Sequence, residues 1–360
     1  MYILYFVLST AAALYSYVLI DMNLTLINHP IWGSIRETAV QLGYFNRPLS
    51  TIIFLILLST FFLVQKNTTM MKKIPRPFYL GIAISIPLII SYPFLSRDFF
   101  NYMFDARIVT FYNQNPYLLK ALDFPNDHWL RFMHWTHRTY PYGPTFLLIT
   151  LVPSFLSFGK LLLSIIFFKI TWVSFYLAAI WIVEKKHKDF ALFFATSPLV
   201  IFEGLINNHN DLIAICLIMI GMMAIFHKKK IKGYLLFFLS VGIKYFTLPY
   251  LFVQDKAKRI NLFVFWALLA GFTYIGVTQG IQPWYLLNFV PILLVTKEME
   301  GLFTAASAGV LLSYYPYVAL GDWTNTEVIA YKNMIVLATF LFVLLVFFIK
   351  KTQLFKSEKV

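Results

Sequence analysis

The sequence predicts an all-α, polytopic transmembrane helical bundle. About 10 helices are expected to span the membrane, and two further segments are broken or re-entrant, for about 10 to 12 segments in total. Hydrophobic residues make up 59% of the 360 residues and charged residues 13%, whereas a soluble domain is apolar in about half and charged in about a quarter of its residues. We treat residues 1–360 as a single transmembrane domain with a large external loop at 96–141.

Ten apolar runs are the candidate spans, and each is long enough to cross a bilayer or nearly so. They lie at residues 2–20, 49–64, 78–95, 161–183, 190–203, 211–226, 260–280, 284–296, 301–319 and 329–349. The first run lacks a basic start and a small-residue cleavage site, so we expect it to be retained as a helix. The single cysteine, Cys216, lies inside an apolar run and is expected to be a packing residue.

Two further runs, 142–158 and 233–253, are interrupted by proline, glycine and, in the second, a lysine. If both cross the membrane, the basic clusters at 185–188 and 228–232 lie outside. If both are re-entrant, these clusters and most of the 30 Lys and Arg residues lie inside, as the positive-inside rule requires. The net charge of +14 is then explained by orientation, and no nucleic-acid partner is expected. Broken helices at membrane depth line a cavity or are buried in protein, so both runs indicate a binding site.

The external segment 96–141 is predicted to begin with an interfacial helix over 98–112, because these residues contain no helix breaker. Its loop opens at Asn115-Pro116. Asp98, Tyr102 and Asp105 recur at i, i+4 and i+7 and therefore share one helix face. Either one carboxylate is a general base, or both are charges exposed at the interface.

The motif EGLINNHND at 203–211 crowds polar side chains into a turn between two apolar runs. Asn208, Asn210 and Asp211 suit the hydroxyls of a sugar, or they cap the following helix. His209 has no second His or Cys at the spacing of a zinc site.

Lys244 is a lone cation within the apolar sequence FFLSVGIKYFTLPYLF. A lysine in such a run costs about 2.5 to 3.5 kcal/mol unless it faces water or an anion, so a phosphate is a natural partner. The alternatives are a lysine that reaches the interface from a short helix and a lysine paired with Asp211.

The sequence lacks the motifs of nucleotide-dependent and metal-dependent transfer: there is no GxxxxGK[ST], GxGxxG, HExxH or D-x-D. In a membrane enzyme with external acids and an embedded cation, the absence of these motifs favours a lipid phosphate as the donor. No serine, nor the cysteine, has a base beside it that would make it a nucleophile.

A succession of motifs resembles the GT-C superfamily of polytopic glycosyltransferases, over most of the chain. It is most similar to the polyprenyl-phosphate-mannose-dependent α-mannosyltransferases. The succession is Asp98-x3-Tyr102-x3-Ala106, Asn115-Pro116-Tyr117, Tyr140-Pro141-Tyr142-Gly143-Pro144, Phe158-Gly159-Lys160, the 203–211 motif, Lys244-Tyr245 and Gln282-Pro283-Trp284-Tyr285. The chain departs from this branch at Asn113, where glycine is common, and in having two helices before the Asp98 helix.

The resemblance implies an inverting transfer without a metal or another cofactor. Asp98, with Asp105 as the second acid, would accept the proton of the acceptor hydroxyl. The donor phosphate would be held by cationic side chains, namely Lys244, Arg97, Arg138 and His209. The sugar and the acceptor would contact Tyr102, Asn208, Asn210, Asp211, Tyr142, Trp284 and Tyr285, although the last three could instead belong to an interfacial aromatic belt.

The expected partners are a polyprenyl-phosphate sugar donor, a glycan or glycolipid acceptor and membrane lipids. The expected location is a bacterial cytoplasmic (inner) membrane, with the active site facing outward. Two other classes fit a polytopic chain with broken helices. A lipid-linked oligosaccharide transporter would have internal repeats and acids at mid-membrane. An O-antigen ligase or polymerase would centre its site on paired arginines.

Overall fold

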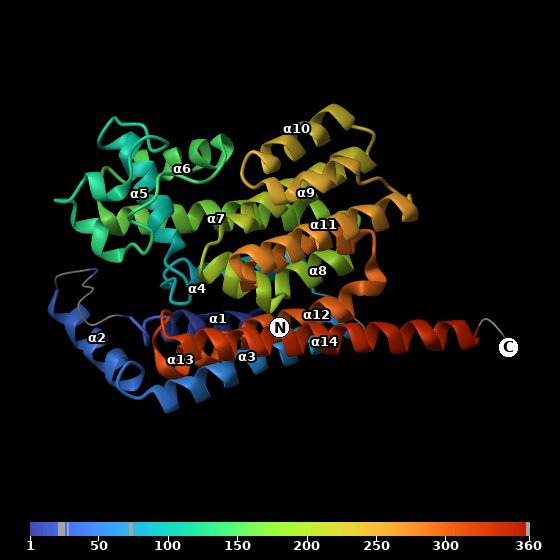
Figure 1. Ribbon diagram of the computed structural model, residues 1–360, viewed down its shortest axis with the longest axis horizontal. Helices are drawn as coiled ribbons and strands as arrows, with labels where there is room; N and C mark the ends of the chain where they lie inside the picture. The colour runs from blue at the N-terminus through green and yellow to red at the C-terminus, as the bar shows by residue number, and fades with distance from the viewer. Residues whose placement is uncertain (21–25, 27–28, 72–74, 358–360) are drawn as a thin grey trace.

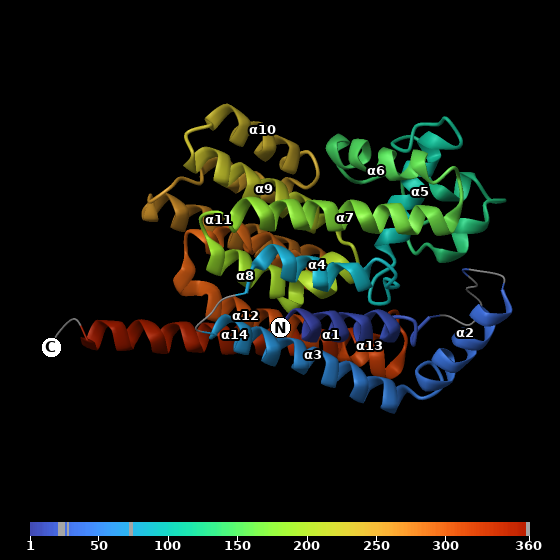
Figure 2. The same ribbon diagram turned by 180° about the vertical axis from the view of Figure 1, so that it is seen from behind.

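The computed structural model describes residues 1–20, 26, 29–71 and 75–357. These residues form helices joined by turns, and no strand occurs among them, which confirms the all-α prediction. The helices run mostly along the long axis of the molecule (Figures 1 and 2). Residues 21–25, 27–28, 72–74 and 358–360, which all belong to the predicted single domain 1–360, lie outside the described residues.

Five helical stretches of the described chain are long and apolar enough to cross a membrane. They are α3 (Arg47–Thr69), α7 (Leu161–Val183), α11 (Lys258–Gln279), the stretch Lys297–Leu320 made of η7 (Lys297–Met299), α12 (Glu300–Leu312) and α13 (Tyr315–Leu320), and α14 (Thr326–Ser357). A sixth span results if α8 (Lys188–Thr196) and the π-helical η3 (Val200–Ile206) are counted as one; the two are bent by 66°. The chain therefore has the helices of a membrane protein.

The remaining elements are shorter. They are α1 (Tyr2–Tyr15), α2 (Pro30–Leu42), α4 (Pro77–Leu88), α5 (Asp98–Thr110), η1 (Ala121–Asp123), η2 (His128–Phe132), α6 (Pro144–Leu156), α9 (Asn210–Phe226), α10 (Lys230–Val241), η4 (Tyr245–Phe252), η5 (Pro283–Phe289) and η6 (Pro291–Leu294). Several predicted spans are thus shorter than a bilayer is thick. The count of about ten spans stays a prediction.

Prolines explain where the helices differ from the predicted runs. The run 190–203 is bent after α8, where Pro198 lacks the N–H that would continue the helix. The run 284–296 forms two short 3-10 helices separated at Pro291. Between the predicted runs 2–20 and 49–64, the structure adds helix α2, which begins at Pro30 and was not predicted.

The two interrupted runs, 142–158 and 233–253, approach each other closely where they are broken. The backbone N–H of Thr145, at the start of α6, donates to the carbonyl of Gly242, at the end of α10. A Cβ at Gly143 would lie 2.1 Å from that carbonyl oxygen, and one at Gly242 would lie 2.3 Å from Thr145 Oγ1. Only glycine fits at both positions, and this approach brings Tyr142 and Lys244 to the same region.

Helix α5 confirms the predicted helix after the third apolar run, but it does not lie at the surface. Its residues 99–108 are all buried. The loop that follows covers it: Phe132 stacks on Phe100 with ring centroids 5.4 Å apart, and the Asn101 side chain exchanges two hydrogen bonds with the backbone of Trp135. The aromatic residues of 111–141 therefore fold back over this helix, and its place at a membrane interface stays a prediction.

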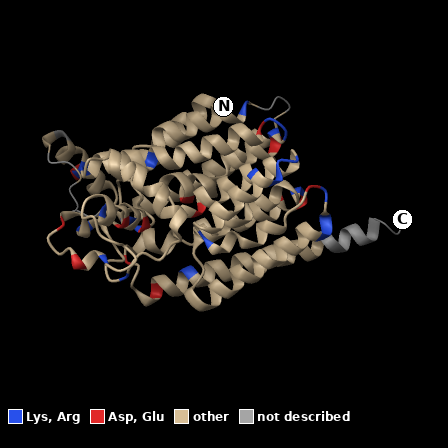
Figure 3. Cartoon of the chain, turned by 90° about the horizontal axis from the view of Figure 1, so that it is seen from above, with Lys and Arg blue, Asp and Glu red and all other residues tan. Residues whose placement is uncertain are grey.

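Charged residues lie mainly toward the two ends of the bundle, and a band between them is largely uncharged (Figure 3). Helices α5 and α6 and the loop between them form one end, while the C-terminal part of α14 extends toward the other (Figures 1 and 2). An uncharged band between charged ends is typical of a bilayer-spanning protein.

Replacing Gly143 with alanine should destabilise the protein, because the added methyl group would overlap the Gly242 carbonyl. We expect a loss of about 1 to 3 kcal/mol, measured as a fall in the melting temperature of the detergent-solubilised protein. Gly271→Ala is the matched control, since its Cβ would meet Phe246 at an ordinary 3.5 Å. Equal melting temperatures for the two variants would contradict the close approach.

Candidate active site

Asp98 is the first residue of α5, and its carboxyl group is held by the loop that covers this helix. The indole Nε1 of Trp135 donates to Asp98 Oδ1 at 3.1 Å. The guanidinium carbon of Arg138 lies 4.6 Å from the centroid of the Trp135 ring, so this cation is near the same carboxyl. The Asp98 side chain is 14% exposed, which leaves it reachable from one side.

The two acids of α5 differ in their surroundings. Burial raises the pKa of Asp98, while Arg138, the Trp135 hydrogen bond and Lys244 oppose the rise. Burial raises the pKa of Asp105 to about 8, with Arg138 opposing and Asp98 adding to the rise. Asp105 is thus largely neutral at pH 7. Neither acid is the freely exposed interfacial charge of the alternative interpretation.

His209 lies between two carboxyl groups. Its Nδ1 is 3.8 Å from Asp98 Oδ2 and its Nε2 is 3.3 Å from Glu203 Oε2. The ring is fully buried and stacks on Trp284, with centroids 4.0 Å apart and planes at 15°. Because both ring nitrogens face carboxyls, the geometry does not favour the predicted contact of His209 with a phosphate.

Lys244 is paired with Asp211, as the alternative interpretation of this lysine anticipated. Its Nζ lies 2.6 and 2.7 Å from the two carboxylate oxygens, and Asn288 donates to the same carboxylate at 2.5 Å. Asp211 lies in the first turn of α9, where the helix dipole favours a negative charge. The lysine also lies 4.9 Å from the centroid of the Tyr285 ring and is 18% exposed, so it could contact a further anion.

Several buried amide groups near this ion pair have no hydrogen-bond partner within the described chain. They are both side-chain polar atoms of Asn208, Nδ2 of Asn210 and Oδ1 of Asn288. Asn208 also adopts a left-handed backbone conformation, with φ of 55°. Buried polar groups are normally hydrogen-bonded, and unpaired ones together with backbone strain are typical of functional sites.

The predicted aromatic residues lie around the same region. Tyr102 is buried and packs edge-on against Tyr142, with centroids 5.3 Å apart. Trp284 and Tyr285 pack against each other at 5.6 Å and contact His209 and Lys244, respectively. These contacts favour a role in the site over a place in an aromatic belt.

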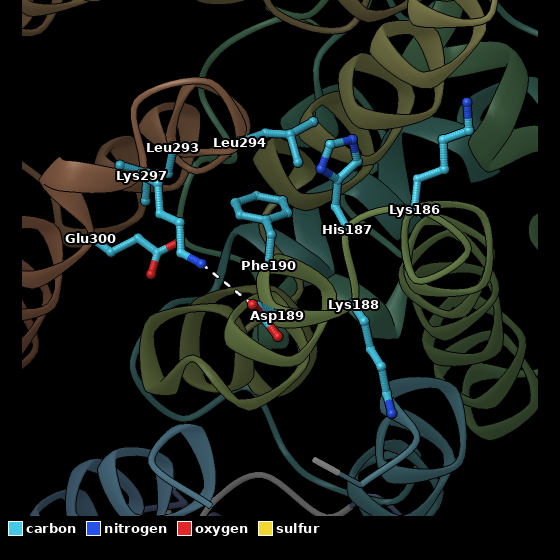
Figure 4. A pocket seen from close by; sticks show the side chains of 9 residues that line it. All are labelled: Lys186, His187, Lys188, Asp189, Phe190, Leu293, Leu294, Lys297 and Glu300. Atoms are coloured by element: carbon cyan, nitrogen blue, oxygen red, sulfur yellow. Dashed lines mark hydrogen bonds and ion pairs between the residues drawn. The ribbon is translucent and has the colours of Figure 1, made fainter. Parts of the chain in front are cut away.

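Arg97 is the predicted residue that stands apart, because it is exposed at the N-cap of α5. A cavity of about 310 Å³ also lies elsewhere, at the loop between α7 and α8 (Figure 4). None of the predicted site residues line this cavity. Its lining residues are Lys186, His187, Lys188, Asp189, Phe190, Leu293, Leu294, Lys297 and Glu300.

Sequence reasoning missed Glu203, Trp135 and Asn288. Glu203 could have been found, because an acid inside the apolar run 190–203 is as costly as the lysine at 244. Trp135 and Asn288 carry no comparable signal, since an aromatic residue in a loop and a single asparagine are ordinary in any protein.

The fold and this cluster together define the class: a helical membrane protein in which a carboxyl, an ion pair and unpaired amides form one polar cluster. The family model described as alpha-(1->6)-mannopyranosyltransferase, N-terminal domain, matches residues 10–254. The chain belongs to this family, which confirms the resemblance to the mannosyltransferases. The match supports the interpretation of the chain as a mannosyltransferase. Comparison with curated proteins and with solved structures found no match.

Asp105 should make the stability of the protein depend on pH. The pKa of this buried acid is about 8 in the folded protein and about 3.9 in the unfolded chain. The acid therefore does not lower the free energy of unfolding at low pH, and its destabilising effect grows as the pH rises between these two values. We expect Asp105→Asn to remove much of this decline, measured as melting temperatures at pH 5 and pH 8. Asp255→Asn is the control, because this side chain is exposed; a decline that persists unchanged in Asp105→Asn would contradict the assignment.

Proposed function

We propose that the chain is an inverting glycosyltransferase that moves mannose from a polyprenyl-phosphate donor to a glycan or glycolipid acceptor. The observation that carries this proposal is the position of the Asp98 carboxyl, which is partly exposed beside Arg138 and within electrostatic reach of Lys244. A base next to cationic groups is what the reaction needs, since it takes a proton from one substrate and leaves negative charge on the other.

Asp98 is the proposed base. The hydroxyl oxygen of the acceptor attacks the anomeric carbon of the sugar while Asp98 accepts the hydroxyl proton and the carbon–oxygen bond to the lipid phosphate breaks. Attack from the face opposite the leaving group inverts the anomeric centre. Asp105 is neutral near pH 7, which supports assigning the base role to Asp98 and leaves Asp105 as a buried neighbour of the site.

The leaving phosphate is proposed to contact Lys244 and Arg138. Lys244 is neutralised in part by Asp211, but its remaining exposure leaves room for a second anion. Arg138 is partly exposed next to Asp98. Developing charge on a phosphate is stabilised strongly by fixed cations in a site with little water. The exposed Arg97 could guide the anion toward the site. No metal or other cofactor takes part in the proposed reaction.

The sugar hydroxyls are proposed to fill the hydrogen bonds that Asn208, Asn210 and Asn288 leave open. Tyr142, Trp284 and Tyr285 provide aromatic faces beside them, which suit the apolar face of a sugar ring. Tyr102 packs edge-on against Tyr142.

The proposed topology places the active site on the non-cytosolic face of a bacterial cytoplasmic membrane, within one transmembrane domain over residues 1–360. The separation of charge into two ends supports it (Figure 3). The basic loops 184–189 and 227–232 would then lie on the cytosolic side, in agreement with the positive-inside rule, and the segment 96–141 would lie on the other.

Asp98→Asn should abolish mannose transfer, because an amide cannot accept the proton. We expect the rate to fall at least about 100-fold, measured with purified protein, polyprenyl-phosphate mannose and a glycan acceptor. The control is Glu298→Gln, which removes an exposed acid. Near-normal turnover of Asp98→Asn would exclude it as the base, and vectorial lipid movement without a new glycosidic bond would replace the transferase with a transporter.

Lys244→Ala should weaken the binding of the donor more than the binding of the acceptor, because only the donor carries a phosphate. We expect the KM for the donor to rise about 10-fold, with a smaller change for the acceptor. Steady-state kinetics with each substrate varied in turn measures both values. Lys229→Ala, at an exposed position, is the control. Equal changes for donor and acceptor would argue that Lys244 serves only to neutralise Asp211.

A further inference from the structure

Glu203, His209 and Asp98 lie in a line, and the proposed function does not yet use the first two. The imidazole lies between the two carboxyls, with 3.3 Å on the Glu203 side and 3.8 Å on the Asp98 side, and neither ring nitrogen has a hydrogen-bond partner among the described residues. Among the ion pairs of the described residues, Glu203 occurs only with His209. Both side chains are fully buried.

His209 is held by one contact to its ring and two hydrogen bonds to its backbone. Trp284 stacks on its face. The indole of Trp172 donates to the backbone carbonyl of His209 at 3.0 Å, and the His209 N–H donates to the backbone carbonyl of Glu203 at 3.0 Å. Turning the ring out of this plane would break the stack on Trp284, and the two backbone hydrogen bonds fix the point from which the side chain extends.

Glu203 lies where an ionised carboxyl group is energetically unfavourable. It belongs to η3, a π-helical segment of the bent span, and π-helical turns occur frequently at functional sites. One oxygen accepts a hydrogen bond from Asn207 at 3.2 Å. The other makes no hydrogen bond among the described residues, although the Tyr314 hydroxyl lies near this carboxyl. A carboxyl at membrane depth without a Lys or Arg in contact is least costly as the neutral acid. As an acid it can donate to His209 Nε2.

We propose that Glu203 and His209 are positioning residues that keep Asp98 ionised and aimed. Glu203 donates from its carboxylic acid to His209 Nε2, which leaves the proton of the neutral ring on Nδ1. That Nδ1–H points at Asp98 Oδ2 and stabilises the carboxylate. Catalytic hydrogen bonds are often long or poorly aligned without substrate, and in this proposal both the 3.3 Å and the 3.8 Å contacts of the ring become hydrogen bonds when the substrates fill the site.

This inference rests on the proposed function, because it assigns a support to the proposed base. The arrangement follows the general logic of an acid–histidine pair that orients a third group. Its effect on Asp98 has a definite sign: a hydrogen bond donated to the charged form of an acid lowers its pKa, so losing that bond raises it. The other groups acting on Asp98 are Arg138, Lys244 and Asp211, with Asp105 nearby.

The test compares Glu203→Leu with Glu203→Gln in the full-length protein. The leucine variant cannot donate, so we expect kcat at neutral pH to fall about 10-fold with the donor KM unchanged. We also expect the acid limb of the kcat profile to move about one pH unit higher. The glutamine variant can still donate from its amide and should recover most of the rate and the wild-type limb. Glu298→Leu, at an exposed site, is the matched control.

The proposal is overturned if Glu203→Leu keeps the wild-type acid limb, if its loss appears in KM instead of kcat, or if Glu203→Gln is as impaired as Glu203→Leu. Melting temperatures of the variants show whether each is folded, and His209→Leu provides a second route to the same shift of the limb. If the wild-type protein transfers no mannose, the proposed function fails instead, which is a separate result.

Discussion

A lysine in the middle of an apolar helix holds the two halves of the site together. Lys169 of α7 is fully buried, and its Nζ donates to Ser91 Oγ at 2.9 Å and to the carbonyls of Leu205 and Ile206 at 3.1 and 2.7 Å. Ser91 belongs to the segment that leads into α5, and Ile206 ends the segment that leads to His209. A buried cation without these acceptors would be very costly, so both segments must stay where the lysine holds them.

The close approach of α6 and α10 acts in the same way on the other side of the site. Gly143 and Gly242 let two backbones touch where a side chain would separate them. Tyr142, directly before the first glycine, and Lys244, two residues after the second, reach the cluster around Asp98. The polar groups of the site are thus positioned by backbone contacts at breaks in helices. This is the arrangement expected for irregular backbone at membrane depth, which is tolerated where it lines a functional site.

The sequence was sufficient for the class of fold, the helix at Asp98 and most of the residues that meet around it, because composition and spacing report burial and helix faces directly. The sequence did not predict where the helices bend or are divided. Pro198 and Pro291 divide predicted runs, yet Pro153 lies inside α6, so proline alone does not say which helix will bend. The burial of α5 was also not predictable, since it depends on the loop at 111–141 folding back, a contact between residues distant in the chain. Glu203 does carry a signal in the sequence, because it is an acid within the apolar run 190–203.

The cluster around Asp98 draws on two stretches of chain. The carboxyl, the histidine and the lysine all lie within residues 10–254, which the family model matches, but the ring over His209 and the amide on Asp211 come from Trp284 and Asn288. A fragment ending at residue 254 would retain the reactive groups and lose the parts that cover them. The imidazole would then meet solvent on one face, and the Asp211 carboxylate would depend on Lys244 alone. Residues 283–288 therefore complete the site as a cover supplied from outside the matched segment.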